Sequence, residues 1–263
     1  MPKLAANLSF MFNELPFLER FAAASRAGFG GVEFLFPYDY EPETLARELT
    51  AHRLVNVLFN VSPGNWDGGE RGLAAVPGRE ADFDAAIDRA LCYARVLGTP
   101  RLHVMAGVLP PDADRALWHT TYVANLRRAA PRAAADNVDL LIEPLNPRDM
   151  PGYFLSTQAE AHAILAEVGM PNVKVQMDLY HAQIVEGDIT VTLRRHLDAI
   201  GHIQIAGAPD RHEPDTGELD CRYIFRLLDE LGYDHWVGCE YRPAGDTLAG
   251  LGWIERVGAR LPG

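Results

Sequence analysis

The stretch VKVQMDLY, residues 173–180, decides the fold of this chain. Its apolar side chains at alternate positions share one face of an extended strand, and Lys174, Gln176 and Asp178 share the other. The apolar face must meet a covering layer of helices, so the polar face must point toward the axis of a closed sheet. The pattern therefore predicts a barrel strand that carries polar groups into the barrel interior.

Seven other short apolar runs match this one in length and in their content of Val, Ile, Leu and Phe. Such runs are typical of strands that are buried on both sides. We predict eight strands, at residues 4–10, 31–36, 55–61, 101–107, 138–145, 173–180, 201–207 and 236–241.

Amphipathic segments separate these runs, with apolar residues at three- and four-residue spacing that predicts helices. Examples are residues 16–28, 79–98 and 222–232. Thr157 and Glu160 have the spacing of a capping box at the start of another helix. Glycine ends four of the helical patterns, where it can adopt the left-handed C-cap conformation: Gly28, Gly98, Gly169 and Gly232.

Eight β-then-α units in 263 residues predict one (β/α)8 TIM barrel, a single domain over residues 1–263. A doubly wound open sheet is the competing architecture. That fold usually carries a glycine-rich phosphate loop after its first strand, and residues 11–16, MFNELP, contain no glycine.

The composition limits the classes of partner. The chain has 24 basic and 36 acidic residues, a net charge of −12, which disfavours nucleic acid and anionic membranes as partners. Cys92, Cys221 and Cys239 are widely spaced, which predicts reduced, buried thiols rather than a disulfide framework. No signal-peptide core or membrane-spanning apolar run is evident. We therefore expect a cytoplasmic protein with a small-molecule partner, and self-association into a homo-oligomer stays open.

Four polar residues fall late in four successive predicted strands: Glu143, Asp178, Gln204 and Glu240. By strand alternation they point inward, at the C-terminal mouth where barrels of this type perform their chemistry. One inward carboxylate is explained equally well by a salt bridge, for example to Lys174. Four inward polar residues on consecutive strands are better explained by a bound divalent cation. Three carboxylates with an amide oxygen suit Mg²⁺ or Mn²⁺.

These residues lie in segments that resemble the hydroxypyruvate isomerase family of the xylose-isomerase-like barrel superfamily, and most closely its 2-oxo-tetronate isomerase branch. The resemblance extends along nearly the whole chain. Its main segments are GVEFLFPYDY (31–40), LIEPLN (141–146), QMDLYHAQIVEGD (176–188), GHIQIAGAPDRHEPDTGE (201–218) and GCEYRP (238–243).

The resemblance implies roles for individual residues. Glu143 and Glu240 match two catalytic glutamates that also bind the metal, and Asp178 and Gln204 match the other two ligands. Related sugar epimerases carry a histidine where this chain has Gln204, which favours a sugar-acid isomerase over a ketose 3-epimerase. The residues that the resemblance relates to substrate contact are His181 and Arg211.

Further residues near the predicted mouth are candidates for contact with a substrate carboxylate, because the protein is acidic overall. They are His212 in the loop after the seventh strand and Arg71 in the loop after the third. Arg71 follows Glu70 and could instead form an ion pair within that loop. Trp66 could cover the mouth or pack on the surface, and His103 points inward without an assigned role.

The predicted reaction is an aldose–ketose type isomerisation through an enediolate, with Glu143 and Glu240 sharing the proton transfers. It would convert hydroxypyruvate to tartronate semialdehyde, or 2-oxotetronate to 3-oxotetronate. Which glutamate takes the first proton stays open. Alternatives are a ketose 3-epimerase, a non-catalytic sugar-acid binding protein, and a metal-dependent endonuclease, which the acidic composition disfavours.

Overall fold

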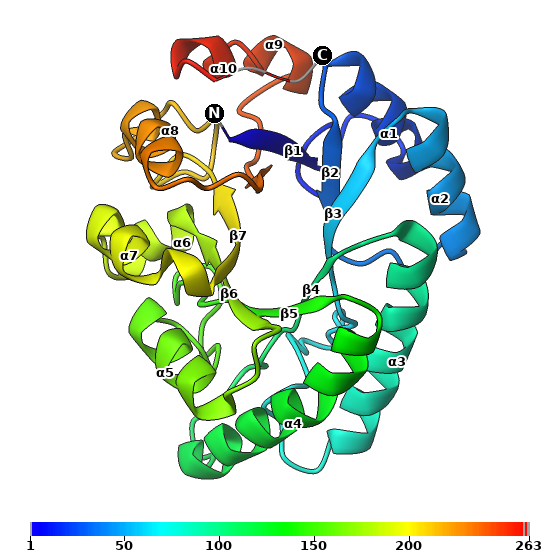
Figure 1. Cartoon of the computed structure of the whole chain (residues 1–263), viewed down its shortest axis with the longest axis vertical. Helices are drawn as coiled ribbons and strands as arrows, with labels where there is room; N and C mark the ends of the chain where they lie inside the picture. The colour runs from blue at the N-terminus through cyan, green and yellow to red at the C-terminus, as the bar shows by residue number, and fades with distance from the viewer. Residues whose placement is uncertain (1, 260, 262–263) are drawn as a thin grey trace.

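Eight parallel strands close into a barrel ringed by helices in the computed structural model, which describes residues 2–259 and 261 (Figure 1). β1 pairs with β8, where Leu4 lies opposite Val237, so the sheet is closed. The predicted TIM barrel is confirmed, and the open-sheet alternative is excluded. The strands are β1 Lys3–Asn7, β2 Gly31–Phe34, β3 Val55–Asn60, β4 Arg101–His103, β5 Asp139–Ile142, β6 Val173–Asp178, β7 Ile200–Ile205 and β8 Trp236–Cys239.

The helices surround the barrel because their apolar faces pack against the outer face of the sheet (Figure 1). Gly98 and Gly169 end α3 and α5 in the left-handed conformation, and Thr157 Oγ1 accepts a hydrogen bond from the Glu160 amide at 3.1 Å, as predicted. The helices are α1 Phe17–Arg26, α2 Pro42–Ala51, α3 Glu80–Leu97, α4 Arg115–Ala135, α5 Gln158–Val168, α6 Leu179–Val185, α7 Ile189–His196, α8 Cys221–Glu230, α9 Thr247–Gly250 and α10 Trp253–Arg256.

All eight strands end earlier than the apolar runs suggest. β4 ends at His103 and β8 at Cys239, whereas the runs extend to residues 107 and 241. The extra residues are buried at the barrel mouth without belonging to the ladder, as Ala106 and Tyr241 illustrate. Hydrophobicity alone cannot separate a strand from a buried loop that follows it.

The barrel interior holds a small apolar cluster of its own, made by Ala5, Val57, Leu58 and Leu141 with Trp236 packed against it. Ala5 lies two residues before Asn7, and Leu141 lies two residues before Glu143. Because alternate residues share a face, the polar side chains form the next layer toward the mouth.

The cysteines differ in part from the prediction. All three are free thiols, and Cys221 and Cys239 are buried, but Cys92 is exposed on α3. The prediction of a buried thiol is therefore wrong for Cys92. An amphipathic helix leaves one face in solvent, and Cys92 lies on that face of α3. Within the described residues, no helix combines the length and apolarity needed to cross a bilayer.

Candidate active site

The four residues predicted at the mouth are all buried at the C-terminal end of the barrel. Asp178 is the last residue of β6 and Gln204 lies in β7, while Glu143 and Glu240 directly follow β5 and β8. A cavity of about 170 Å³ opens there, and its lining includes Glu143, Glu240, His181 and Arg211. Its size suits a small ligand rather than a drug-sized one.

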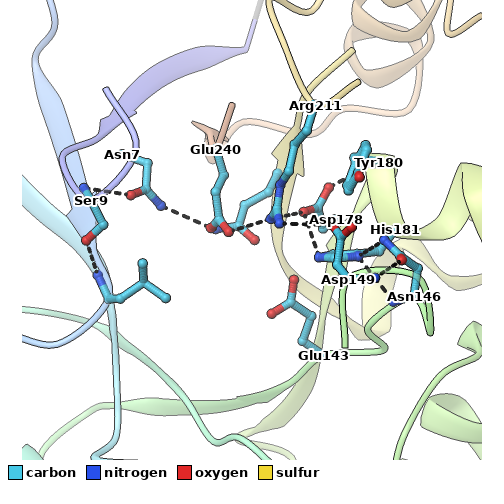
Figure 2. A network of polar contacts seen from close by, with 12 residues as sticks. Asn7, Ser9, Glu143, Asn146, Asp149, Asp178, Tyr180, His181, Arg211 and Glu240 are labelled. Carbon is cyan, nitrogen blue, oxygen red and sulfur yellow. Dashed lines mark hydrogen bonds and ion pairs between the residues drawn. The ribbon is translucent and has the colours of Figure 1, made fainter. Parts of the chain in front are cut away.

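Arg211 reaches into this cluster from the loop between β7 and α8 (Figure 2). Its Nη2 lies 2.8 Å from Glu240 Oε1 and 3.5 Å from Asp178 Oδ2, and its Nη1 lies 3.4 Å from Asp149 Oδ2. The Arg211 backbone has a φ of 59°, a conformation that is uncommon for residues other than glycine. A largely buried guanidinium therefore links three carboxylates and offsets part of the desolvation of Asp178 and Glu240.

Glu240 is held from its other side by two amides. Asn7 Nδ2 donates to Glu240 Oε2 at 3.0 Å and to Glu33 Oε1 at 2.9 Å. Gln204 Nε2 donates to the same two carboxylates. The main-chain N–H of Ser9 donates to Asn7 Oδ1, which fixes the orientation of that amide. Glu240 thus has a defined rotamer, with Oε2 facing the amides and Oε1 facing Arg211.

Glu33, in β2, anchors this arrangement from within the barrel, where it is fully buried. Its Oε2 accepts a hydrogen bond from His202 Nε2 at 2.7 Å. A Cβ added at Gly238 would overlap the Glu33 carboxylate, so only glycine allows this close approach.

A further amide lies beside Gln204 at the site. Gln176 Nε2 donates to Gln204 Oε1 at 2.7 Å, and Gln176 also acts on Glu143, whose pKa it lowers slightly against the larger effect of burial. The oxygen of Gln204 consequently faces Gln176, and its nitrogen faces Glu240. To bind a cation through its oxygen, the Gln204 amide would have to turn over. Gln176 would have to turn with it, so that its Oε1, which has no partner among the described residues, could accept from Gln204.

The electrostatics of the buried carboxylates favour their protonated forms. Burial, followed by the charges of Glu240 and Asp178, raises the pKa of Glu143 well above its usual value. Burial, with Asp178 and Glu33 adding to it and Arg211 opposing it, raises the pKa of Glu240 to about 8. The pKa of Asp178 is raised to about 6, again mainly by burial. Carboxyl groups tuned in this way can take up and release protons near neutral pH.

His181, on α6, presents a hydrogen-bond donor to the cavity. The Asn146 main-chain N–H donates to His181 Nδ1 at 3.2 Å, so the proton of the neutral ring lies on Nε2. Burial lowers the pKa of His181 well below its usual value, which keeps the ring neutral. Nε2 lies 3.6 Å from Asp178 Oδ2 and faces the site.

The donor set fits a hard divalent cation. Ligand atoms of Glu143, Asp178 and His181 lie within 4.8 Å of one another. Glu143 Oε1 is buried without a hydrogen-bond partner among residues 2–259 and 261, although Oε2 lies 3.3 Å from His103 Nδ1. In this structure the proton of His181 occupies Nε2, so the carboxylates are the available ligands.

The structure places Arg71 and His212 outside the cavity lining. The Arg71 guanidinium stacks 3.8 Å from the centroid of Trp66, and it donates to the carbonyls of Trp66 and Glu70. Trp66 itself lines the cavity. His212 Nδ1 donates to the carbonyl of Arg242 at 2.8 Å. Both residues support neighbours that do line the cavity.

Several residues that the structure places at the site were assigned no role on the basis of the sequence. Strand alternation could have identified Asn7 and Glu33, because each faces inward next to apolar residues that face outward. Nothing in the sequence pattern indicates the loop residues, whose positions depend on how the loops fold. The residues that were missed are Asn7, Phe10, Glu33, Asn146, Asp149, Gln176, His202 and Arg242.

Comparison with known proteins identifies relatives over the whole barrel. The model of the xylose isomerase-like TIM barrel family matches residues 21–257. A 2-oxo-tetronate isomerase from Cupriavidus necator is 59% identical over 97% of this chain and 98% of its own length. A hydroxypyruvate isomerase from Escherichia coli is 43% identical over 97% of this chain and 99% of its own.

Solved structures agree on the fold. A Brucella melitensis protein named AP endonuclease, family 2 superposes with a TM-score of 0.96, at 52% identity over 97% of this chain and 99% of that one. A D-psicose 3-epimerase from Clostridium cellulolyticum has a TM-score of 0.80 at 18% identity, over 99% of this chain and all of that one. The second likeness shows the shared barrel alone.

Proposed function

This chain belongs to the xylose isomerase-like TIM barrel family and, within it, to the hydroxypyruvate and 2-oxo-tetronate isomerases, and from that premise we propose its reaction and its catalytic groups. It is an isomerase of sugar acids. The proposed reaction is the isomerisation of hydroxypyruvate to tartronate semialdehyde, or of 2-oxotetronate to 3-oxotetronate.

The convergence of Glu143 and Glu240 on one small cavity carries this proposal. Both are buried, both have a raised pKa, and they come from β5 and β8, which lie apart in the barrel. A reaction that moves a proton between neighbouring carbons needs one group to remove the proton and another to assist at the second carbon. Two such carboxyl groups facing one cavity supply this pair.

In the proposed reaction, one glutamate removes a proton from C3 of the 2-oxo acid, and the electron pair of that C–H bond forms the C2–C3 double bond of an enediolate. The other glutamate moves the hydroxyl proton from O3 toward O2. Return of the first proton to C2 then leaves the carbonyl group at C3. We propose that Glu143 and Glu240 share these steps. His181 Nε2–H and the Arg211 guanidinium are proposed to donate hydrogen bonds to substrate oxygens as charge develops on them.

We further propose that Glu143, Asp178, Glu240 and Gln204 would hold one Mg²⁺ or Mn²⁺. A bound divalent cation would stabilise negative charge on the substrate oxygens and hold the substrate in place. The buried Glu143 Oε1, which has no hydrogen-bond partner among the residues that the structure describes, supports this proposal. Gln204 would join only after its amide turns over, away from Gln176.

The decisive experiment removes metal with a chelator, restores Mg²⁺ or Mn²⁺, and measures kcat/KM for hydroxypyruvate, 2-oxotetronate and a neutral ketose. Turnover of a 2-oxo acid that returns with the metal is expected, with solvent deuterium appearing in the product. Absence of isomerisation of any of the three with metal present would overturn the proposal. Preference for the neutral ketose would instead favour a 3-epimerase.

DNA cleavage is the alternative that the name of the Brucella protein suggests. Binding of a nucleic-acid backbone relies on a cluster of Lys and Arg, and this chain has an excess of 12 acidic residues. We expect no incision of a duplex that contains an abasic site. From the reduced thiols we also propose that the protein works in the cytoplasm, with a small molecule as its partner.

A further inference from the structure

We propose that Arg242 binds the carboxylate of the substrate and thereby selects acids over neutral sugars, an inference that rests on the proposed function. Arg242 lines the same cavity as Glu143 and Glu240. It follows Glu240 by two residues, in the segment that leaves the C-terminal end of β8.

The other cations near the mouth are already engaged. Arg211 pairs with Glu240, Asp178 and Asp149, and Arg71 stacks on Trp66. In contrast, within residues 2–259 and 261 the Arg242 guanidinium has no hydrogen bond or ion pair, and it lies 5.9 Å from the centroid of the Phe10 ring. Its five N–H donors are therefore available to an incoming anion.

The backbone of Arg242 is nevertheless fixed. Its N–H donates to the carbonyl of Arg211 at 2.7 Å, and its carbonyl accepts from His212 Nδ1 at 2.8 Å. The side chain thus extends from an ordered point on the rim. An anchored backbone with a free guanidinium is suited to bidentate binding of a carboxylate, because little of the chain has to be ordered on binding.

The cavity lining is rich in carboxyl groups, so an acidic substrate needs a positively charged partner there. Glu143, Asp149 and Glu240 are carboxyl groups, and a 2-oxo acid adds another. Arg211 and Arg242 are the two arginines of the lining, and Arg211 already contacts three carboxylates. A substrate whose carboxylate rests on Arg242 has its reacting carbons in the remainder of the small cavity, which Glu143 and Glu240 also line.

The test compares Arg242→Gln and Arg242→Lys with the matched control Arg148→Gln in the Mg²⁺-loaded enzyme. Arg148 is also exposed, in the loop after β5, and lies outside the cavity lining. The probes are D-glycerate, which carries the carboxylate but has no carbonyl group to isomerise, and glyceramide, its neutral amide. Their dissociation constants report binding without turnover.

The wild type and Arg148→Gln should prefer glycerate, and Arg242→Gln should lose about 10- to 100-fold in glycerate affinity with little change for glyceramide. Arg242→Lys should lose less, because it keeps the charge without the bidentate geometry. An unchanged preference in Arg242→Gln, or no preference in the wild type, would overturn the inference. Failure of the proposed function would appear separately, as a wild type that binds glycerate yet isomerises neither 2-oxo acid.

Discussion

Arg211 Nη2 lies 2.8 Å from Glu240 Oε1, inside a pocket where both side chains are almost completely shielded from solvent. The same nitrogen also faces Asp178. The positive charge of Arg211 therefore compensates carboxylates that would otherwise repel one another, and removing it should leave an uncompensated buried charge.

Arg211→Met should accordingly destabilise the metal-free protein by about 3–5 kcal/mol, the usual cost of breaking a buried ion pair from one side. Denaturant unfolding in the presence of a chelator measures this cost. Mg²⁺ should recover part of the loss, because a cation bound at the carboxylates substitutes for the missing charge. Stability equal to the wild type would show that the carboxylates are neutral without Arg211.

Glu240→Gln should lower kcat by about 10²- to 10⁴-fold, the usual contribution of a positioned acid or base. Asn7 and Gln204 hold the residue in place, and a glutamine of the same shape can keep at least one of these hydrogen bonds, so the fold should survive. Steady-state kinetics measures the loss of kcat, and circular dichroism checks that the fold is retained. Glu218→Gln, a change at an exposed glutamate, serves as the control. Near-normal turnover would remove Glu240 from the mechanism.

The stability of the chelated protein should fall as the pH rises from about 4.5 to about 8. The pKa of Glu240 is about 8 in the fold against 4.5 in the unfolded chain, so within this window the folded state retains a proton that the unfolded state has released. The stabilisation from the Glu240 proton is complete below the unfolded pKa of 4.5 and is lost as the pH rises through the folded pKa of about 8. Thermal unfolding across this range should show the decline.

Two comparisons isolate the cause of that decline. Glu240→Gln should make the decline shallower, because one titrating group is gone while Glu143 and Asp178, whose pKa values are also raised, remain. Mg²⁺ should oppose the decline, since a bound cation favours the ionised carboxylates and binds more tightly as they lose their protons. A chelated wild type whose melting temperature rises over the same window would contradict the proposed protonation.

Gly238→Ala should destabilise the protein by about 1–3 kcal/mol, because its Cβ would overlap the Glu33 carboxylate and force the buried side chain to move. Gly245→Ala is the matched control: it lies in the next loop, and its added Cβ has no neighbour within 4 Å. Equilibrium unfolding of the two variants gives the difference in their free energies of unfolding. Equal stability would mean that Glu33 can be displaced at no cost.

The sequence by itself determined the barrel and the depth of the four mouth residues. A strand has a period of two, so the alternation at 173–178 already separates the face toward the helices from the face toward the axis. Eight apolar runs of strand length, separated by helical segments in one chain, leave few closed topologies. The same count places Asp178 at the end of β6 and Glu143 directly after β5, at the mouth of the barrel.

Only the tertiary structure decided what those residues contact. Asn7 and Glu240 are separated by 233 positions and share a hydrogen bond because closure of the barrel brings β1 beside β8. Arg71 and Arg242 are indistinguishable by charge, yet one stacks on Trp66, and the other lies over Phe10 without a hydrogen-bond or ion-pair partner for its guanidinium in the described part of the chain. Which hydrogen bonds a side chain makes depends on loop conformation and long-range pairing, and a local pattern of hydrophobicity contains neither.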